Sequence, residues 1–257
     1  MVDFQKDVNV FATRILAGTA AGMEIESSIV KIQDSQSEVR MIFAAAPSQD
    51  GMLAYLANSG LIKWEKVVAF HMDEYIGLPE DSPQLFASYL KENLFSKVRL
   101  KEVHLLDTSG DLEKEMAHYA AMLNKAAIDI VCLGIGENGH IAFNDPPVAD
   151  FNDPKTIKAV ELDDACRIQQ VNDGCFPTLA EVPTRAVTLT IPTLMRGNHL
   201  FCVVLGENKS EAVKNTLVGP LSTACPASIL TTHSNCTFFF NHSAVKDIPD
   251  LKENIVK

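Results

Sequence analysis

The sequence predicts an α/β protein built in three layers, with a doubly wound, mostly parallel sheet between two layers of helices. Short apolar runs recur along the chain, most of them without polar alternation, which is typical of strands buried on both faces. Stretches of helical periodicity separate these runs. The 257 residues, 47% of them hydrophobic, are enough for one large core. Because no repeat or linker divides the sequence, we predict a single domain over residues 1–257.

Each predicted strand is a short apolar run that ends in a turn or a polar cluster, and each predicted helix spaces its apolar residues three and four positions apart. The strands expected on this basis cover residues 39–46, 67–70, 103–106, 128–132, 186–190, 201–205, 228–230 and 236–240. The expected helices cover residues 8–23, 52–59, 83–94, 112–125 and 210–217. Strands that alternate with helices in this way are typical of a parallel sheet.

Residues 146–183 interrupt the alternation of strands and helices. Five prolines and many polar residues predict a long irregular segment there. A long loop inside a compact domain is usually either functional or disordered. We therefore predict that this segment is a lid that covers a pocket.

The net charge of the chain is −11, from 22 basic and 33 acidic residues. An acidic surface argues against nucleic acid or an anionic membrane as a partner, although a local pocket can still bind a phosphate. No apolar run is long enough to span a bilayer, and no secretory signal is visible, so we expect a cytoplasmic protein. The six cysteines form no C-x-x-C pair and are interpreted as reduced core residues, with no metal site.

Two of the polar clusters that follow predicted strands could bind or transform a substrate. Ser48 and Gln49 stand where a helix begins, a position that suits a phosphate, although an ordinary helix-capping serine is the simpler interpretation. Asp73, Glu74 and Tyr75 follow the next strand. Adjacent carboxylates at a sheet edge suggest catalysis, and a salt-bridged loop pair is the alternative.

Two further positions complete the candidate site. His140 lies in a glycine-rich stretch between Asn138 and Asp145, where a polar acceptor could orient the imidazole for acid–base work. The alternative is a core histidine satisfied by backbone groups. Lys209 begins a helix after an apolar strand and could reach an anion, although many such lysines are only solvated surface residues.

Together these residues resemble the family of glucosamine-6-phosphate deaminases, which also contains galactosamine-6-phosphate isomerases and, more distantly, 6-phosphogluconolactonases. The resemblance extends from about residue 10 to residue 240. Its most specific parts are HMDEYIGLP at residues 71–79 and GIGENGHIAFNDP at residues 134–146. It implies a Rossmann-like fold and an enzyme that needs no metal or cofactor.

The resemblance also implies roles for individual residues. His140 would assist opening of the sugar ring, and Asp73 would move a proton between C2 and C1, giving a ketose phosphate and ammonia. Ser48 and Lys209 would hold the phosphate. The remaining residues expected at the site are Asn138 and Asp145, which would support His140, and Gln49, Glu74, Tyr75, Gly136, Gly139 and Asn172, which would contact the substrate.

Three departures from the family pattern bear on activity. Asn138 stands where the family has an aspartate, Asp145 where it has a glutamate, and Asn172 where it has a phosphate-clamping arginine. An amide cannot stabilise an imidazolium by charge, and losing a bidentate guanidinium weakens phosphate binding. Three hypotheses follow: an active amino-sugar-phosphate deaminase, a lactonase, and a sugar-phosphate-binding protein without catalysis. A homo-oligomer is possible, since oligomeric state varies within the family.

Overall fold

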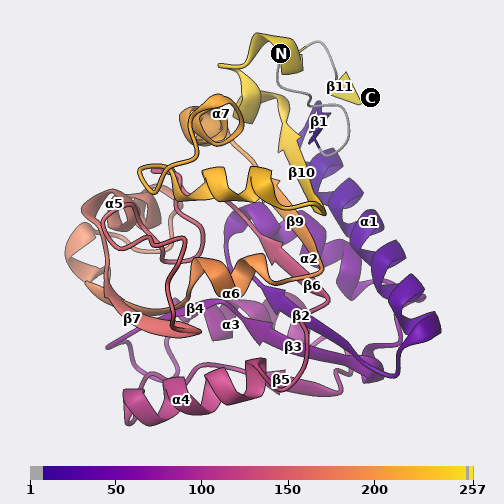
Figure 1. The fold of residues 1–257 in the computed structure, drawn as a ribbon, viewed down its shortest axis with the longest axis vertical. Coiled ribbons are helices and arrows are strands. Elements are labelled where there is room, and N and C mark those ends of the chain that lie inside the picture. Colours follow the sequence, from indigo (N-terminus) through magenta and orange to yellow (C-terminus); the bar gives the residue numbers. More distant parts are fainter. Residues whose placement is uncertain (1–7, 253–254, 257) are drawn as a thin grey trace.

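The computed structural model describes residues 8–252 and 255–256, and its centre is an eight-stranded parallel sheet (Figure 1). The strand order is β11-β1-β10-β9-β6-β2-β3-β5. The bounds of these strands are β1 Val8–Phe11, β2 Val39–Phe43, β3 Val67–His71, β5 Glu102–His104, β6 Ile130–Leu133, β9 His199–Val204, β10 Cys236–Asn241 and β11 Ile255–Val256. The α/β class and the mostly parallel sheet predicted from the sequence are therefore confirmed.

Helices cover both faces of this sheet, which gives the three layers. Their bounds are α1 Arg14–Ser35, α2 Asp50–Ala57, α3 Phe86–Leu90, α4 Leu112–Leu123, α5 Asp164–Asn172, α6 Ile191–Met195, α7 Ser210–Val218 and α8 Pro249–Lys252. A π-helical turn, Lys91–Phe95, continues α3. Side chains of α1 and α2 pack on one face of the sheet, and those of α4, α6 and α7 pack on the other.

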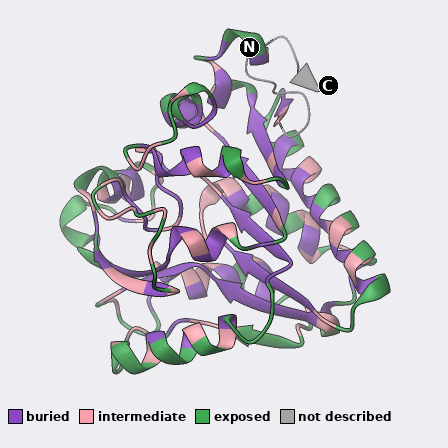
Figure 2. Cartoon of the chain, in the orientation of Figure 1, coloured by how far each residue is buried: buried purple, intermediate pink, exposed green. Residues whose placement is uncertain are grey.

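Alternation of side chains along the buried strands produces these two cores. In β2, for example, Met41 and Phe43 belong to the core beneath α1 and α2, and Ile42 belongs to the opposite core. All five residues of β2 and of β3 are buried, as Figure 2 shows for the middle of the sheet. Burial on both faces explains why these strands read as continuous apolar runs.

A second, smaller sheet lies beside the first and is antiparallel, with the order β4-β8-β7. Its strands are β4 Asp73–Tyr75, β7 Ile157–Glu161 and β8 Arg185–Leu189. Together with α5 it encloses a third apolar cluster, which includes Tyr75, Phe143 and Phe176. The segment 146–183 is therefore not irregular throughout, because β7 and α5 form within it.

Two other sequence-based assignments were wrong. Residues 8–11 form β1, which pairs with β10, and the helix begins only at Arg14, with Thr13 accepting a hydrogen bond from Leu16 N at 3.2 Å. Residues 228–230 lie in a 3-10 helix, Pro226–Thr232, rather than in a strand. Within the described residues, no helix combines the length and apolar character needed to span a membrane. The cytoplasmic location and the homo-oligomer stay predictions.

Candidate active site

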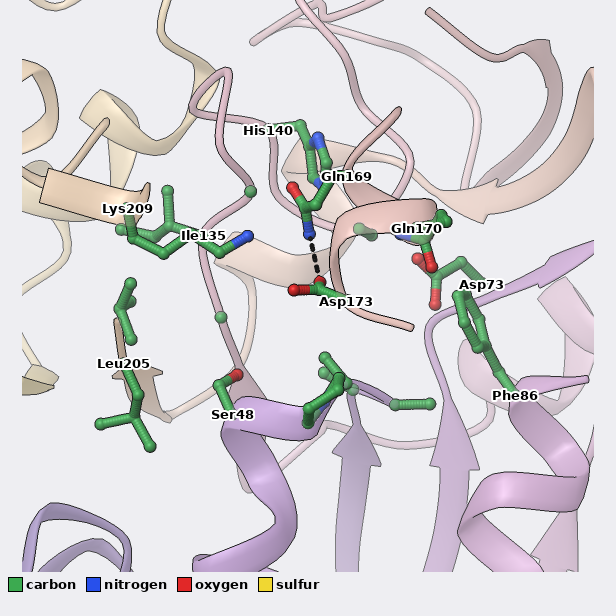
Figure 3. Close-up of a pocket in the computed structure, with 18 of the residues that line it drawn as sticks. Ser48, Asp73, Phe86, Ile135, His140, Gln169, Gln170, Asp173, Leu205 and Lys209 are labelled. Carbon is green, nitrogen blue, oxygen red and sulfur yellow. Dashed lines mark hydrogen bonds between the residues drawn. The ribbon is translucent and has the colours of Figure 1, made fainter. Parts of the chain in front are cut away.

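A pocket opens at the carboxyl ends of the central strands, where the loops after β2, β3, β6 and β9 meet (Figure 3). It contains about 770 Å³ of space, part of it open to solvent. Five of the residues that the sequence singled out line it: Ser48, Asp73, Gly136, His140 and Lys209. They come from four separate strand ends, which a parallel sheet brings to one edge.

Asp73 is the first residue of β4, and it leaves the central sheet two residues after β3 ends. Its partner in the antiparallel pairing with β8 is Thr188. The side chain is only 7% exposed. Burial raises the pKa of Asp73 well above the usual 3.8, and the carboxylates of Glu74 and Asp145 raise it further. A carboxyl group in this environment is a stronger base than an exposed one and is suited to take and return a proton.

Glu74 and Tyr75, which were expected to contact the substrate, do not line the pocket. Glu74 Oε1 accepts hydrogen bonds from Tyr75 N at 2.9 Å and Phe86 N at 3.1 Å, and its Oε2 accepts one from Ala87 N at 2.9 Å. The carboxylate thus holds the first turn of α3. Tyr75 packs its ring against Phe143, with the centroids 5.3 Å apart. Both side chains therefore contact other parts of the protein, whereas the sequence predicted contacts with the substrate.

His140 is positioned by a tight turn after β6. Gly136 N donates to His140 O at 2.9 Å, and Gly139 N donates to Gly136 O at 3.0 Å. The imidazole lies so close to Gly136 that a Cβ there would stand 2.2 Å from its Cε1 and Nε2. Gly139 has φ +84°, and a Cβ on it would meet Cys225 Sγ at 2.7 Å. Gly139 therefore shapes the turn without lining the pocket, whereas Gly136 is part of the wall.

Asp145 lies behind the imidazole, with its Oδ1 2.9 Å from His140 Nδ1. Its side chain is 1% exposed. Burial by itself raises the pKa of Asp145, but the contact with His140, helped by hydrogen bonds from Asn138 and from Asp163 N, outweighs burial and holds the pKa below its usual value. An ionised carboxylate in this place can orient the imidazole and stabilise an imidazolium.

Asn138 supports this pair from one side. Its Oδ1 accepts a hydrogen bond from His140 N at 3.0 Å, and its Nδ2 donates to Asp145 Oδ1 at 3.0 Å and Asp163 Oδ2 at 3.4 Å. The charged partner that the resemblance placed at position 138 is therefore supplied by Asp145. The amide at 138 serves as a donor between two carboxylates.

We expect Asn138→Asp to destabilise the protein, although it restores the residue that the family usually has. The substitution replaces the donor between Asp145 and Asp163 with a third carboxylate, at a cost of about 1–3 kcal/mol. The measurement is the thermal midpoint, which should fall by several degrees, with activity below that of the original protein. Asn172→Asp, an exposed amide that faces Glu137, is the control and should change little. A gain in activity for Asn138→Asp would contradict this interpretation.

The far end of the pocket carries positive charge. Lys209, at the entry to α7, is 7% exposed, and burial lowers its pKa while Asp173 and Glu137 act in the opposite direction. Arg14 lines the pocket as well, and its Nη1 donates to Leu205 O at 3.3 Å. Ser48 contributes its hydroxyl group from the turn after β2. Two cationic side chains and a hydroxyl group at one end of a pocket are groups that can bind an anion.

Gln49 stabilises this end from beneath and does not line the pocket. The side chain is fully buried, and its Nε2 donates to Ser48 Oγ at 2.9 Å and Val203 O at 3.2 Å. It therefore ties the Ser48 turn to β9. Asn172 is also absent from the pocket wall, because it lies on the exposed side of α5 and donates to Glu137 Oε2 at 3.4 Å.

Sequence reasoning missed the residues that α5 and α1 bring to the pocket. Gln169, Gln170 and Asp173 close it from above, and Gln169 Nε2 donates to Asp173 Oδ2 at 3.2 Å (Figure 3). A stretch free of proline and glycine, Asp164–Asn172, could have indicated this helix. Arg14 was missed because β1 was interpreted as helix. A strand at Val8–Phe11 would have placed Arg14 at the carboxyl edge of the sheet.

The family model for glucosamine-6-phosphate isomerases and 6-phosphogluconolactonase matches residues 15–239 of this chain. The chain belongs to this family. Glucosamine-6-phosphate deaminases from Bacillus thuringiensis (strain Al Hakam) and Bacillus anthracis (strain A0248) are 33% identical to it over 226 residues, which is 88% of this chain and 83% of each relative. The family membership expected from residues 71–79 and 134–146 is thus confirmed.

Solved structures of the family share the fold. A monomeric glucosamine-6-phosphate deaminase superposes with a TM-score of 0.84 at 25% identity, covering 93% of this chain and 99% of that one. A 6-phosphogluconolactonase from Thermotoga maritima superposes with a TM-score of 0.75 at 19% identity, covering 91% and 99%. At 19% identity, the similarity to the lactonase shows the fold alone. The choice between a deaminase and a lactonase activity therefore depends on the residues of the site.

Proposed function

We propose that this protein is an amino-sugar-phosphate deaminase and isomerase. It converts a 2-amino-2-deoxyhexose 6-phosphate, such as glucosamine- or galactosamine-6-phosphate, into a ketose 6-phosphate and ammonia. The observation that carries the proposal is a buried carboxyl group of raised pKa, Asp73, in the same pocket as a carboxylate-backed imidazole, His140. The Bacillus relatives are named for this reaction.

The sugar phosphate would enter with its phosphate toward Lys209, Ser48 and Arg14. Lys209 Nζ makes no ion pair with any residue of the described chain, so the buried ammonium group is available to an anion. Arg14 supplies a guanidinium from α1, whereas Asn172 faces away from the pocket. The phosphate would then be held without the arginine that the family pattern places on the lid.

The chemistry would begin with proton transfer at the sugar ring. His140, supported by Asp145, would help to open the ring and expose the C1 aldehyde. Asp73 would then take the proton from C2 and return it to C1. In the same step O1 gains a proton and the nitrogen on C2 loses one, which leaves a hydroxyl group at C1 and an imine at C2. Water adds to that imine, and ammonia and the C2 ketone are released. The buried position of Asp73 favours this step because a desolvated carboxylate is the stronger base.

The pH dependence of kcat/KM should follow the ionisation of Asp73. The base must be ionised to accept the C2 proton, and burial together with Glu74 and Asp145 raises its pKa well above 3.8. We therefore expect kcat/KM to fall on the acid side at a pH well above 4, since protonation removes the base. Thermal midpoints measured at each pH separate this loss from unfolding. Full activity down to about pH 4 would exclude Asp73 as the base.

We expect Lys209→Met to raise KM for the sugar phosphate roughly 10- to 100-fold with a smaller change in kcat, because a charge-assisted hydrogen bond is worth about 1.5–3 kcal/mol. Lys214→Met, which removes an exposed lysine from the same helix, is the control and should leave KM unchanged. Turnover of unphosphorylated glucosamine, if measurable, should not distinguish Lys209→Met from the original protein. An unchanged KM for Lys209→Met would place the phosphate elsewhere.

The function is tested by incubating purified protein with glucosamine-6-phosphate and with galactosamine-6-phosphate and measuring ammonia and ketose phosphate. The proposal requires both products in equal amounts from at least one of these sugars. In parallel, hydrolysis of 6-phosphogluconolactone without ammonia release from the sugars would identify a lactonase. Saturable binding with no product from any substrate would identify a binding protein, the hypothesis favoured by an amide at position 172.

A further inference from the structure

A cysteine that the proposed reaction does not use lies next to His140 and Asp145. The ligand-forming atoms of His140, Asp145 and Cys166 all lie within 4.8 Å of one another. Cys166 is on α5, and the other two residues are on the loop after β6. All three are buried, with 8%, 1% and 1% of their surface exposed. The spacing of the cysteines in the sequence gave no sign of this cluster.

The donor atoms are an imidazole nitrogen, a carboxylate oxygen and a thiol sulfur. This is a ligand set for Zn²⁺, which binds such atoms in tetrahedral geometry at about 2.0–2.3 Å. Donors at those bond lengths stand about 3.5 Å apart, so side-chain shifts of about 1 Å would be enough to close the cluster on the ion. The pocket gives an entry path, since His140 forms part of its wall.

One atom of the cluster is left without a hydrogen bond. His140 Nδ1 is 2.9 Å from Asp145 Oδ1, but it is buried and its N–H is too poorly aligned to form a hydrogen bond. Leaving a buried polar atom without a partner is costly. If the proton of this nitrogen moves to Nε2, a cation bonded to the freed lone pair of Nδ1 would supply the missing partner.

Charge balance favours a divalent cation here. On binding, the thiol would lose its proton to solvent and the thiolate would bond to the metal, while Asp145 stays ionised and His140 stays neutral. The three ligands then carry two negative charges, which the ion neutralises. Neutralisation matters because all three side chains are buried, and an uncompensated buried charge is expensive.

We propose that His140, Asp145 and Cys166 form a binding site for a thiophilic divalent cation such as Zn²⁺, and that the bound cation inhibits the enzyme. The inhibitory part rests on the proposed function, whereas the binding part does not. With the metal on Nδ1, the proton of the neutral imidazole is on Nε2. His140 can then no longer accept a proton from the sugar, and Asp145 no longer supports it.

The binding part is tested with Co²⁺, added to protein that has been freed of metal with a chelator. A thiolate ligand gives an intense thiolate-to-cobalt charge-transfer band in the near ultraviolet. We expect this band to saturate at one equivalent in the original protein and in Cys175→Ala, which removes a half-buried thiol of the same segment. Cys166→Ala should lack it. Cys166→Ser, which fills the same space, guards against a folding defect and should also lack the band.

The inhibitory part is tested by titrating Zn²⁺ into the sugar-phosphate assay. Cys166→Ala should turn over normally without zinc, and its half-inhibiting zinc concentration should rise at least about 10-fold, as expected for loss of one ligand. Absence of the cobalt band, or its persistence in both Cys166 variants, overturns the site. A band with no inhibition by Zn²⁺ overturns the inhibitory role. If no sugar phosphate is turned over, the proposed function fails, and the cobalt band still decides whether the cation site exists.

Discussion

Asp73→Asn should reduce kcat by about 10²–10⁴-fold, the range that general acid–base catalysis contributes. The asparagine has nearly the same shape, so the substrate should still bind, and KM should change little. The removed group is the one that would carry the proton from C2 to C1, and no other carboxyl group on the pocket wall shares its burial. The measurement is steady-state ammonia release from the sugar phosphate, with binding followed separately by thermal shift.

Two observations control this experiment. Asp173→Asn removes the other carboxylate that lines the pocket and should keep kcat within about 10-fold of the original, because Asp173 would not contact the reacting carbons.

The second control is the stability of the Asp73→Asn protein. Since the folded state raises the pKa of Asp73, it binds that proton more tightly than the unfolded chain, and the carboxyl group costs stability as the pH rises. At neutral pH, Asp73→Asn should therefore unfold at or above the original temperature. Turnover above one-tenth of the original rate would remove Asp73 from its proposed role.

Gly136→Ala should reduce kcat by roughly 10²-fold, the effect expected when a catalytic group moves by about 1 Å. The added Cβ would stand 2.2 Å from two ring atoms of His140 and 2.4 Å from Nδ1, so the imidazole cannot keep its place. Moving the ring also separates Nδ1 from the carboxylate of Asp145, which lies 2.9 Å away. The expected loss is therefore mainly in kcat, measured at saturating substrate.

Gly134→Ala is the matched control for this prediction. It lies in the same loop after β6 and on the same pocket wall, but a Cβ there would approach no atom closer than 3.3 Å. We expect it to lower kcat far less than Gly136→Ala and to leave the fold intact by thermal unfolding. If Gly136→Ala kept kcat within about threefold of the original while folded, the position of His140 would not matter for turnover.

The main features of the pocket could be predicted because a parallel sheet obeys a simple rule. Loops after parallel strands gather at one edge, so Ser48, Asp73, His140 and Lys209 could be grouped from their positions after apolar runs. The prediction required only that each strand be recognised. The strand at Val8–Phe11 was not recognised, and Arg14 was therefore missing from the predicted site.

The roles of neighbouring side chains could not be predicted in the same way. Asp73 and Glu74 are adjacent in the sequence, yet one lines the pocket and the other binds the first turn of α3. Strand β4 decides this, because successive side chains point to opposite faces. Similarly, the segment 146–183 forms β7 through pairing with β8, a contact between residues far apart in the sequence.

The sequence by itself determined the fold class, the family and the set of polar residues at the sheet edge, because these depend on apolar periodicity and on short motifs. Only the tertiary structure decided which of Asn138 and Asp145 faces the imidazole of His140. Asn138 is closer to His140 in the sequence, but the turn at residues 136–140 aims the imidazole at Asp145. Asn138 instead accepts from the backbone of His140 and donates to the carboxylates of Asp145 and Asp163. The physical reason is that side-chain direction follows from the backbone path and from distant packing, and neither can be read from residue spacing alone.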